Sequence, residues 1–199
     1  FVAYFTPADT ANYDWTGIDG WNEVESRVEK TVSVTVTKAD SSIAAAPTAI
    51  LNLEYDGSAK ALVTAGIANG GQMQYSLDGT TWSADIPAGT NANTYTVYYK
   101  VVGDANHDDN AGGSVSVTIG KADKTAPEVA GVDETIKSKA DGRITGVDDT
   151  MEYKKQGDAN YIAITADTVE NLAAGTYLVR YKETENYFAS SDKQIVIAD

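Results

Sequence analysis

Residues 92–100 read Ala-Asn-Thr-Tyr-Thr-Val-Tyr-Tyr-Lys, an alternation with a period of two that is typical of a β-strand. The pattern returns at residues 173–182 as Ala-Ala-Gly-Thr-Tyr-Leu-Val-Arg-Tyr-Lys, and its tail is seen once more at Val2–Phe5. Each copy is followed by a turn that contains asparagine and then by a β-branched run that closes on Ala-Asp. A strand–turn–strand unit used three times predicts a tandem array of all-β modules.

The alternation also predicts which side chains of the repeated strand face the core. In the first full copy these are Tyr95, Val97 and Tyr99, and in the second they are Tyr177, Val179 and Tyr181. In an immunoglobulin-type β-sandwich, a tyrosine two residues before a buried strand position folds back and hydrogen-bonds the preceding loop, which is called a tyrosine corner. We therefore predict structural tyrosine corners at Tyr95 and Tyr177.

Turn signals divide the chain into three segments. Residues 40–122 have turn signals about every 8–12 residues and no helical period, which predicts an immunoglobulin-like β-sandwich. Residues 123–199 repeat the same plan in a shorter form and predict a second one. Residues 1–39 match only the C-terminal part of a module, with an insertion over Tyr13–Lys30 and a strand predicted over Thr31–Thr37. Because the chain opens within a strand, we expect it to be a piece of a longer protein.

Composition narrows the function classes. The hydrophobic fraction of 42% is ample for packed cores, and 29 acidic residues against 15 lysines and arginines give a formal net charge of −14. This balance argues against nucleic acid as a partner, since phosphate contacts need clustered basic residues. No apolar run approaches the length of about 18 residues that crosses a bilayer, so we expect no membrane insertion in this part of the chain. There is no cysteine, which fits either the cytosol or a surface protein whose cores need no disulfide.

Three stretches resemble a known family: residues 53–62 (Leu-Glu-Tyr-Asp-Gly-Ser-Ala-Lys-Ala-Leu), residues 75–82 (Tyr-Ser-Leu-Asp-Gly-Thr-Thr-Trp) and residues 88–97. They are similar to tandem immunoglobulin-like repeats of bacterial cell-surface proteins, and most of all to the MBG-type repeats with their Tyr-Asp-Gly start. Residues 5–13 look like the tail of such a repeat, and residues 123–199 like a diverged relative. The insertion at Tyr13–Lys30 departs from the repeat pattern.

The resemblance implies a non-catalytic stalk or adhesion module at the surface or in the cell wall of a Gram-positive bacterium, where scarce cysteine is ordinary. The partners it implies are neighbouring repeats and a host or extracellular-matrix protein or glycan. It brings no catalytic residue and no cofactor. Two alternatives stay open: a module that binds a carbohydrate or protein ligand, and an accessory region of a secreted glycan-degrading enzyme.

Few residues suggest chemistry of their own. Trp15 and Trp21 lie in the glycine-containing insertion and are candidate ligand contacts, because flat rings stack on sugars; the alternative is a hydrophobic plug between modules. The single histidine, His107, lies in an acidic loop and could form a triad only with a serine and a carboxylate. The oxygen donors of Asp104–Asn110 are of the type that calcium prefers, but the spacing of an EF-hand is missing, so solvated turn residues are the favoured interpretation. We predict no catalytic site, no cofactor and no metal site.

Overall fold

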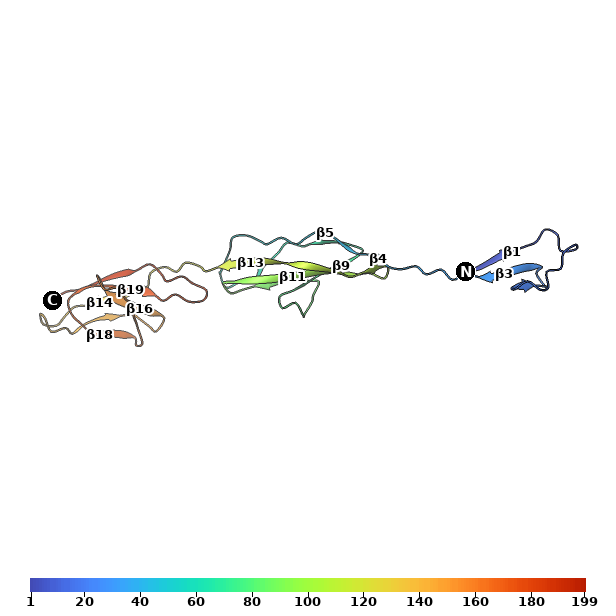
Figure 1. Ribbon diagram of the computed structural model, residues 1–199. Coiled ribbons are helices and arrows are strands. Elements are labelled where there is room, and N and C mark those ends of the chain that lie inside the picture. The colour runs from blue at the N-terminus through green and yellow to red at the C-terminus, as the bar shows by residue number, and fades with distance from the viewer. The chain divides into compact units, whose positions relative to one another are not determined.

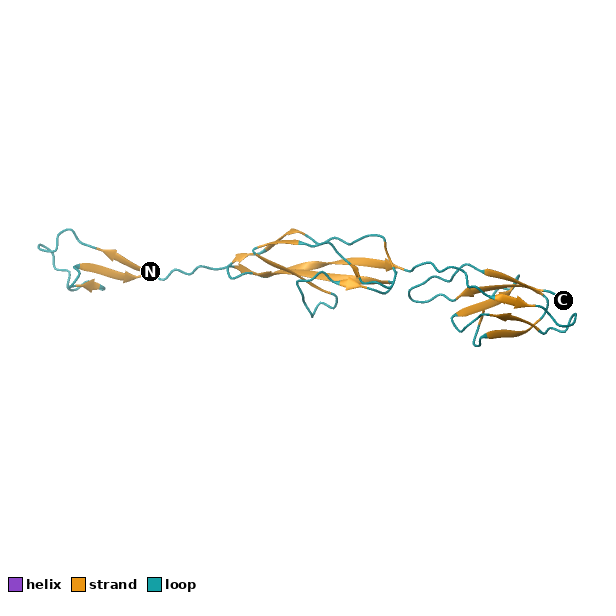
Figure 2. Cartoon of the chain, turned by 180° about the vertical axis from the view of Figure 1, so that it is seen from behind, coloured by secondary structure: helices purple, strands orange, loops and turns teal.

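The computed structural model describes residues 1–199 as strands, turns and loops (Figures 1 and 2). The all-β prediction is confirmed, since twenty strands form seven small sheets and no helix is present. No helix therefore exists that is long and apolar enough to cross a membrane. The chain folds as two compact units, Phe1–Ala39 and Asp40–Asp199.

The first unit is one antiparallel sheet in the order β1-β3-β2, made of β1 (Val2–Phe5), β3 (Arg27–Thr31) and β2 (Trp21–Asn22). Pro7 is the only buried residue of the unit. The prediction of a strand over Thr31–Thr37 is wrong, because β3 ends at Thr31, the first residue of the predicted strand. Thr31 pairs with Val2, the first residue of β1, and Val32 exchanges two backbone hydrogen bonds with Phe1.

Ten strands follow over residues 39–120, and the first of them begins at the last residue of the first unit. They are β4 (Ala39–Asp40), β5 (Ser42–Ala45), β6 (Leu53–Glu54), β7 (Lys60–Ala61), β8 (Ile67–Asn69), β9 (Gly71–Ser76), β10 (Ala88–Gly89), β11 (Asn93–Gly103), β12 (His107–Asp108) and β13 (Asn110–Gly120). The main sheet has the order β6-β13-β11-β9, and β5 pairs with β8, β7 with β10 and β4 with β12. β6 joins the end of β13 in parallel, whereas the other pairs of the main sheet are antiparallel.

One hydrophobic cluster holds this part together. Val97 and Val101 of β11 contribute fully buried side chains, and Leu62 and Val63, which follow β7, meet them from outside the main sheet. Tyr95 and Tyr99 pack against the cluster as partly buried neighbours, as their place in the alternation predicted. Burying each valine is worth about 1.5–3 kcal/mol, so packing is the main source of stability in this cysteine-free chain.

Residues 123–199 contain the remaining strands: β14 (Ala130–Val132), β15 (Gly142–Thr145), β16 (Met151–Lys155), β17 (Ile162–Ala163), β18 (Thr168–Leu172), β19 (Gly175–Tyr181) and β20 (Lys193–Ile197). They form two antiparallel sheets, β14-β15-β18 and β17-β16-β19-β20. Both sheets contribute to one second cluster, with Ile144 and Leu172 from the first and Val179 and Ile197 from the other. The two clusters of the second unit share no residue.

The repeated strand makes the same backward hydrogen bond in both copies. The hydroxyl of Tyr95 donates to the carbonyl oxygen of Asn91 at 2.9 Å, and that of Tyr177 donates to Ala173 at 2.8 Å. The two tyrosines thus tie the strand to the loop four residues upstream. Burial of the Tyr177 side chain also raises the pKa of its hydroxyl.

We predict that Tyr177→Phe lowers the free energy of unfolding by about 0.5–1.5 kcal/mol, because it removes one hydrogen bond from a buried hydroxyl. The effect of Tyr95→Phe is expected to be smaller, since its bond lies at the surface. Urea unfolding of the chain measures both, with Tyr98→Phe on the exposed face as the matched control. Equal stability of Tyr177→Phe and Tyr98→Phe would contradict the prediction.

Asp78 organises the turn after β9. Its carboxylate accepts the backbone N–H groups of Thr80 and Thr81, each at 2.7 Å, and the hydroxyl of Ser76 at 2.8 Å. These bonds, first of all that from Thr81, lower the pKa of Asp78 well below its ordinary value. Gly79 takes a left-handed φ of 73° in this turn, a conformation open to glycine at little cost.

A carboxylate with a lowered folded-state pKa stabilises the fold above its unfolded pKa and loses that contribution as the pH falls. We therefore expect Asp78→Asn to reduce the acid sensitivity of this part of the chain between about pH 5 and about pH 3. Amide exchange in β11, compared at the two pH values after correction for intrinsic rates, reports the local stability. If the variant loses as much stability on acidification as the native chain, Asp78 does not have this role.

Candidate functional site

Trp15 and Trp21, the two candidate contact residues, meet in the first unit. Trp21 lies on β2, and Trp15 comes from the loop between β1 and β2. Their rings stack with centroids 6.0 Å apart and planes inclined by 26°, and Phe5 of β1 tilts against Trp15, also at 6.0 Å. Both indole side chains are half-buried. The three rings therefore form an aromatic cluster with part of its surface open.

Strand register explains why the rings gather on one side of the sheet. Phe5 and Trp21 are both paired with Val28 of β3, and residues paired across neighbouring strands point to the same face. The opposite face carries polar groups. There Arg27 pairs with Asn22, and its guanidinium lies 4.1 Å from the centre of the Tyr4 ring.

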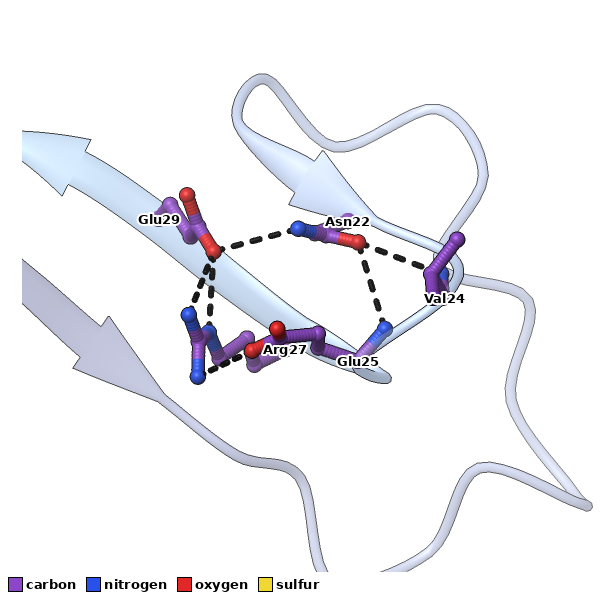
Figure 3. A network of polar contacts seen from close by, with 5 residues as sticks. All are labelled: Asn22, Val24, Glu25, Arg27 and Glu29. Carbon is purple, nitrogen blue, oxygen red and sulfur yellow. Dashed lines mark hydrogen bonds and ion pairs between the residues drawn. The ribbon is translucent and has the colours of Figure 1, made fainter.

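The polar face is held by a small network around Glu29 (Figure 3). One carboxylate oxygen of Glu29 accepts from Arg27 at 2.9 Å and from the amide of Asn22 at 3.1 Å. The hydrogen bond to Glu29 raises the pKa of the Arg27 guanidinium. The side-chain oxygen Oδ1 of Asn22 accepts hydrogen bonds from the backbone N–H groups of Val24 and Glu25. These bonds fix the turn between β2 and β3. A second ion pair joins Arg27 to Glu25.

An open hollow lies beside this network. It is lined by residues of all three strands, of the loop before β2 and of the turn after β2, namely Val2, Thr16, Gly20, Trp21, Asn22, Glu23, Glu29 and Thr31. One aromatic ring next to amide, hydroxyl and carboxylate groups is the lining that a sugar needs, because its apolar face stacks and its hydroxyls donate and accept. The hollow holds Trp21 but not Trp15, so the two candidate residues differ in what they can touch.

Two carboxylates of the acidic loop after β11 accept hydrogen bonds from the loop itself. Asp104 accepts the N–H of Asn106 at 2.8 Å and lies 2.7 Å from the imidazole Nδ1 of His107, while Asp109 accepts the N–H of Gly103. The contact with His107 is the main reason that the pKa of Asp104 is lowered. No group of three or more histidine, aspartate or glutamate side chains in the chain is arranged to hold a metal ion. The geometry of the loop is that of a turn stabilised by side chains.

The carboxylate of Glu134 is buried and links two loops of residues 123–199. Its Oε1 accepts the backbone N–H groups of Ala140 and Ala174, both at 3.0 Å, and so joins two loops at one end of the second cluster. Residue type alone could not predict this position, because Glu134 sits in a polar stretch that looks exposed in the sequence.

Sequence reasoning also missed Phe5, Asn22, Arg27 and Glu29. A usable signal was present for the last two, since residues two apart in a strand share a face and opposite charges there pair. Asn22 follows Trp21 directly and could have been identified as the turn residue of a hairpin.

Comparison with known proteins adds no assignment, since no family model matches the chain and neither the curated proteins nor the solved structures include a significant match.

Proposed function

We propose that the chain is a non-catalytic extracellular segment of a multidomain bacterial surface protein, in which tandem immunoglobulin-like β-sandwiches act as a stalk or adhesion module. The repeated strand supports this, as do the two separate clusters, one of which is shared by two facing sheets. The proposed location is the cell surface or cell wall. The proposed partners are neighbouring repeats and a host or matrix protein or glycan.

The observation that carries the proposal is a set of hydrogen bonds around Ala122, where residues 40–122 meet residues 123–199. We call this place the junction. The N–H of Ala122 donates to Asn186 O and its carbonyl accepts from Phe188 N–H, both at 3.0 Å. Asn186 Oδ1 accepts the N–H of Ala92 at 2.8 Å, and its amide donates to Asn91 at 3.3 Å. Segments on both sides of the junction are therefore tied by several hydrogen bonds rather than joined by a single free strand.

Two further contacts strengthen the junction. Lys121 pairs with Glu183 at 2.5 Å, and the rings of Tyr55 and Tyr187 meet edge to face at 5.2 Å. A stalk must resist bending between its modules, and contacts of this kind restrict the bending that a flexible linker would allow. Stiffness at this point is thus the property that the proposed function needs.

We expect Asn186→Ala to loosen the junction, because it removes two side-chain hydrogen bonds worth about 0.5–1.5 kcal/mol each and keeps the backbone bonds. The chain has no cysteine, so Ala84→Cys and Ala159→Cys give two unique spin-label sites, both exposed. The distance distribution between the labels should broaden in Asn186→Ala and stay narrow in Asn93→Ala. A broad distribution in the unsubstituted chain would contradict the stalk proposal.

The hollow beside Trp21 favours a second candidate function, binding of a glycan. We predict that any glycan bound by the chain on a glycan array is lost in Trp21→Ala and retained in Trp82→Ala, because only Trp21 lines the hollow. Trp82 lies in the second unit near Lys100 and serves as the matched control. Binding that survives Trp21→Ala would exclude the hollow as the site.

A further inference from the structure

The three arginines of the chain differ in their surroundings. Arg27 and Arg180 each pair with a glutamate and lie over a tyrosine ring, 4.1 Å and 3.7 Å from the ring centre. The side chain of Arg143 in β15 has no ion pair, hydrogen bond or ring contact within the chain. Acidic residues outnumber lysines and arginines by 29 to 15 in this chain, so a guanidinium without a partner needs an explanation.

A β-bulge sets the surroundings of Arg143. The pairing of β15 with β18 shifts between Gly142 and Ile144. Arg143 alone therefore lies opposite two residues of β18, Glu170 and Asn171. Asn171 has a left-handed φ of 60°, a conformation that asparagine tolerates better than most residues. The bulge thus turns two polar side chains of β18, instead of one, to the exposed face that carries Arg143.

These side chains line a hollow on that face of the β14-β15-β18 sheet. Its volume is about 280 Å³, and it is lined by Val132, Asp133, Thr135, Asp141, Arg143, Glu170 and Asn171. Val132 of β14 is paired with Arg143, so an apolar side chain lies on the same face beside the guanidinium. Ligand pockets have volumes of about 300–1,000 Å³, so this hollow suits a small molecule.

The charges in the hollow are only partly neutralised within the chain. Asp141 accepts hydrogen bonds from Thr135, and Asp133 accepts one from a backbone N–H at 2.8 Å. The side chain of Glu170 has no hydrogen bond or ion pair, and it does not pair with Arg143. Arg143 and Glu170 therefore present opposite charges in one hollow without neutralising each other.

We propose that this hollow binds a small zwitterion, a molecule with one carboxylate and one ammonium group. The carboxylate would accept two hydrogen bonds from Arg143, because the planar guanidinium matches its geometry. The ammonium group would donate to Glu170, and the amide of Asn171 can donate to the one or accept from the other. A dianion such as phosphate fits less well, because three carboxylates line the hollow. The site is separate from the hollow beside Trp21 and is not used by the proposed stalk.

The test adds ω-amino acids to the full chain, from glycine to 6-aminohexanoate, and follows the backbone amide signals by NMR. The distance between the two charges increases along this series. We expect saturable shifts at residues 132–143 and 170–171 with at least one member. Acetate and butylamine carry one charge each and should bind about tenfold more weakly or worse. Arg143→Gln and Glu170→Gln should each weaken binding by about tenfold or more, because each removes a hydrogen bond to a charged group.

Both side chains are exposed, so the two variants are expected to fold, and unchanged amide signals in β16 and β19 check this. Lys182→Gln is the matched control, since it changes the net charge as Arg143→Gln does but lies outside the hollow. Its binding should equal that of the native chain. Absence of saturable shifts with every member of the series would overturn the proposal. So would equal binding of acetate or butylamine, or binding that Arg143→Gln and Glu170→Gln leave intact.

Discussion

Burial of one valine at the centre of each repeated strand is the constraint on which the second unit depends. Val97 and Val179 are both fully buried, and both belong to strands that have a neighbouring strand on either side in the same sheet. A residue in that position fixes the alternation of its whole strand, because a slip of one residue would turn every core side chain to the solvent. The tyrosine two residues earlier is then placed where its hydroxyl reaches the preceding loop. The buried valine thus determines both the packing of the core and the register of the repeated strand.

The first unit consists of a single three-stranded sheet. Its sheet has no core, and its order comes from ring stacking on one face and charged contacts on the other. Such contacts at a surface are individually weak, since water screens them and competes for them. The unit therefore presents aromatic side chains, such as those of Tyr4 and Phe5, at its surface. The candidate site for a glycan, the hollow at Trp21, belongs to this unit.

The all-β class could be predicted from the sequence because a period of two repeats throughout the chain. The inward-facing side of the repeated strand could be predicted for the same reason. Lys193 shows where alternation alone fails, because it falls on the same side of its strand as Ile195 and Ile197, where an apolar residue is expected. The structure resolves this, because Lys193 stands at the start of β20 and reaches Glu128 at 3.3 Å. The strand over Thr31–Thr37 could not be judged, since pairing depends on a neighbouring segment and not on the local pattern. The network around Glu29 depends on the β2–β3 hairpin, which was hidden inside a stretch interpreted as an insertion.

The bonds of Asn186 bear on whether one segment of the second unit could be exchanged for another. The asparagine is supplied by the last segment of the chain, whereas Asn91 and Ala92, which it bonds, are supplied by the preceding one. Replacing only one of these segments would keep the hydrophobic cluster of the other and would leave the amide opposite a foreign loop. The fit at this point therefore depends on both segments together, and neither segment specifies it alone.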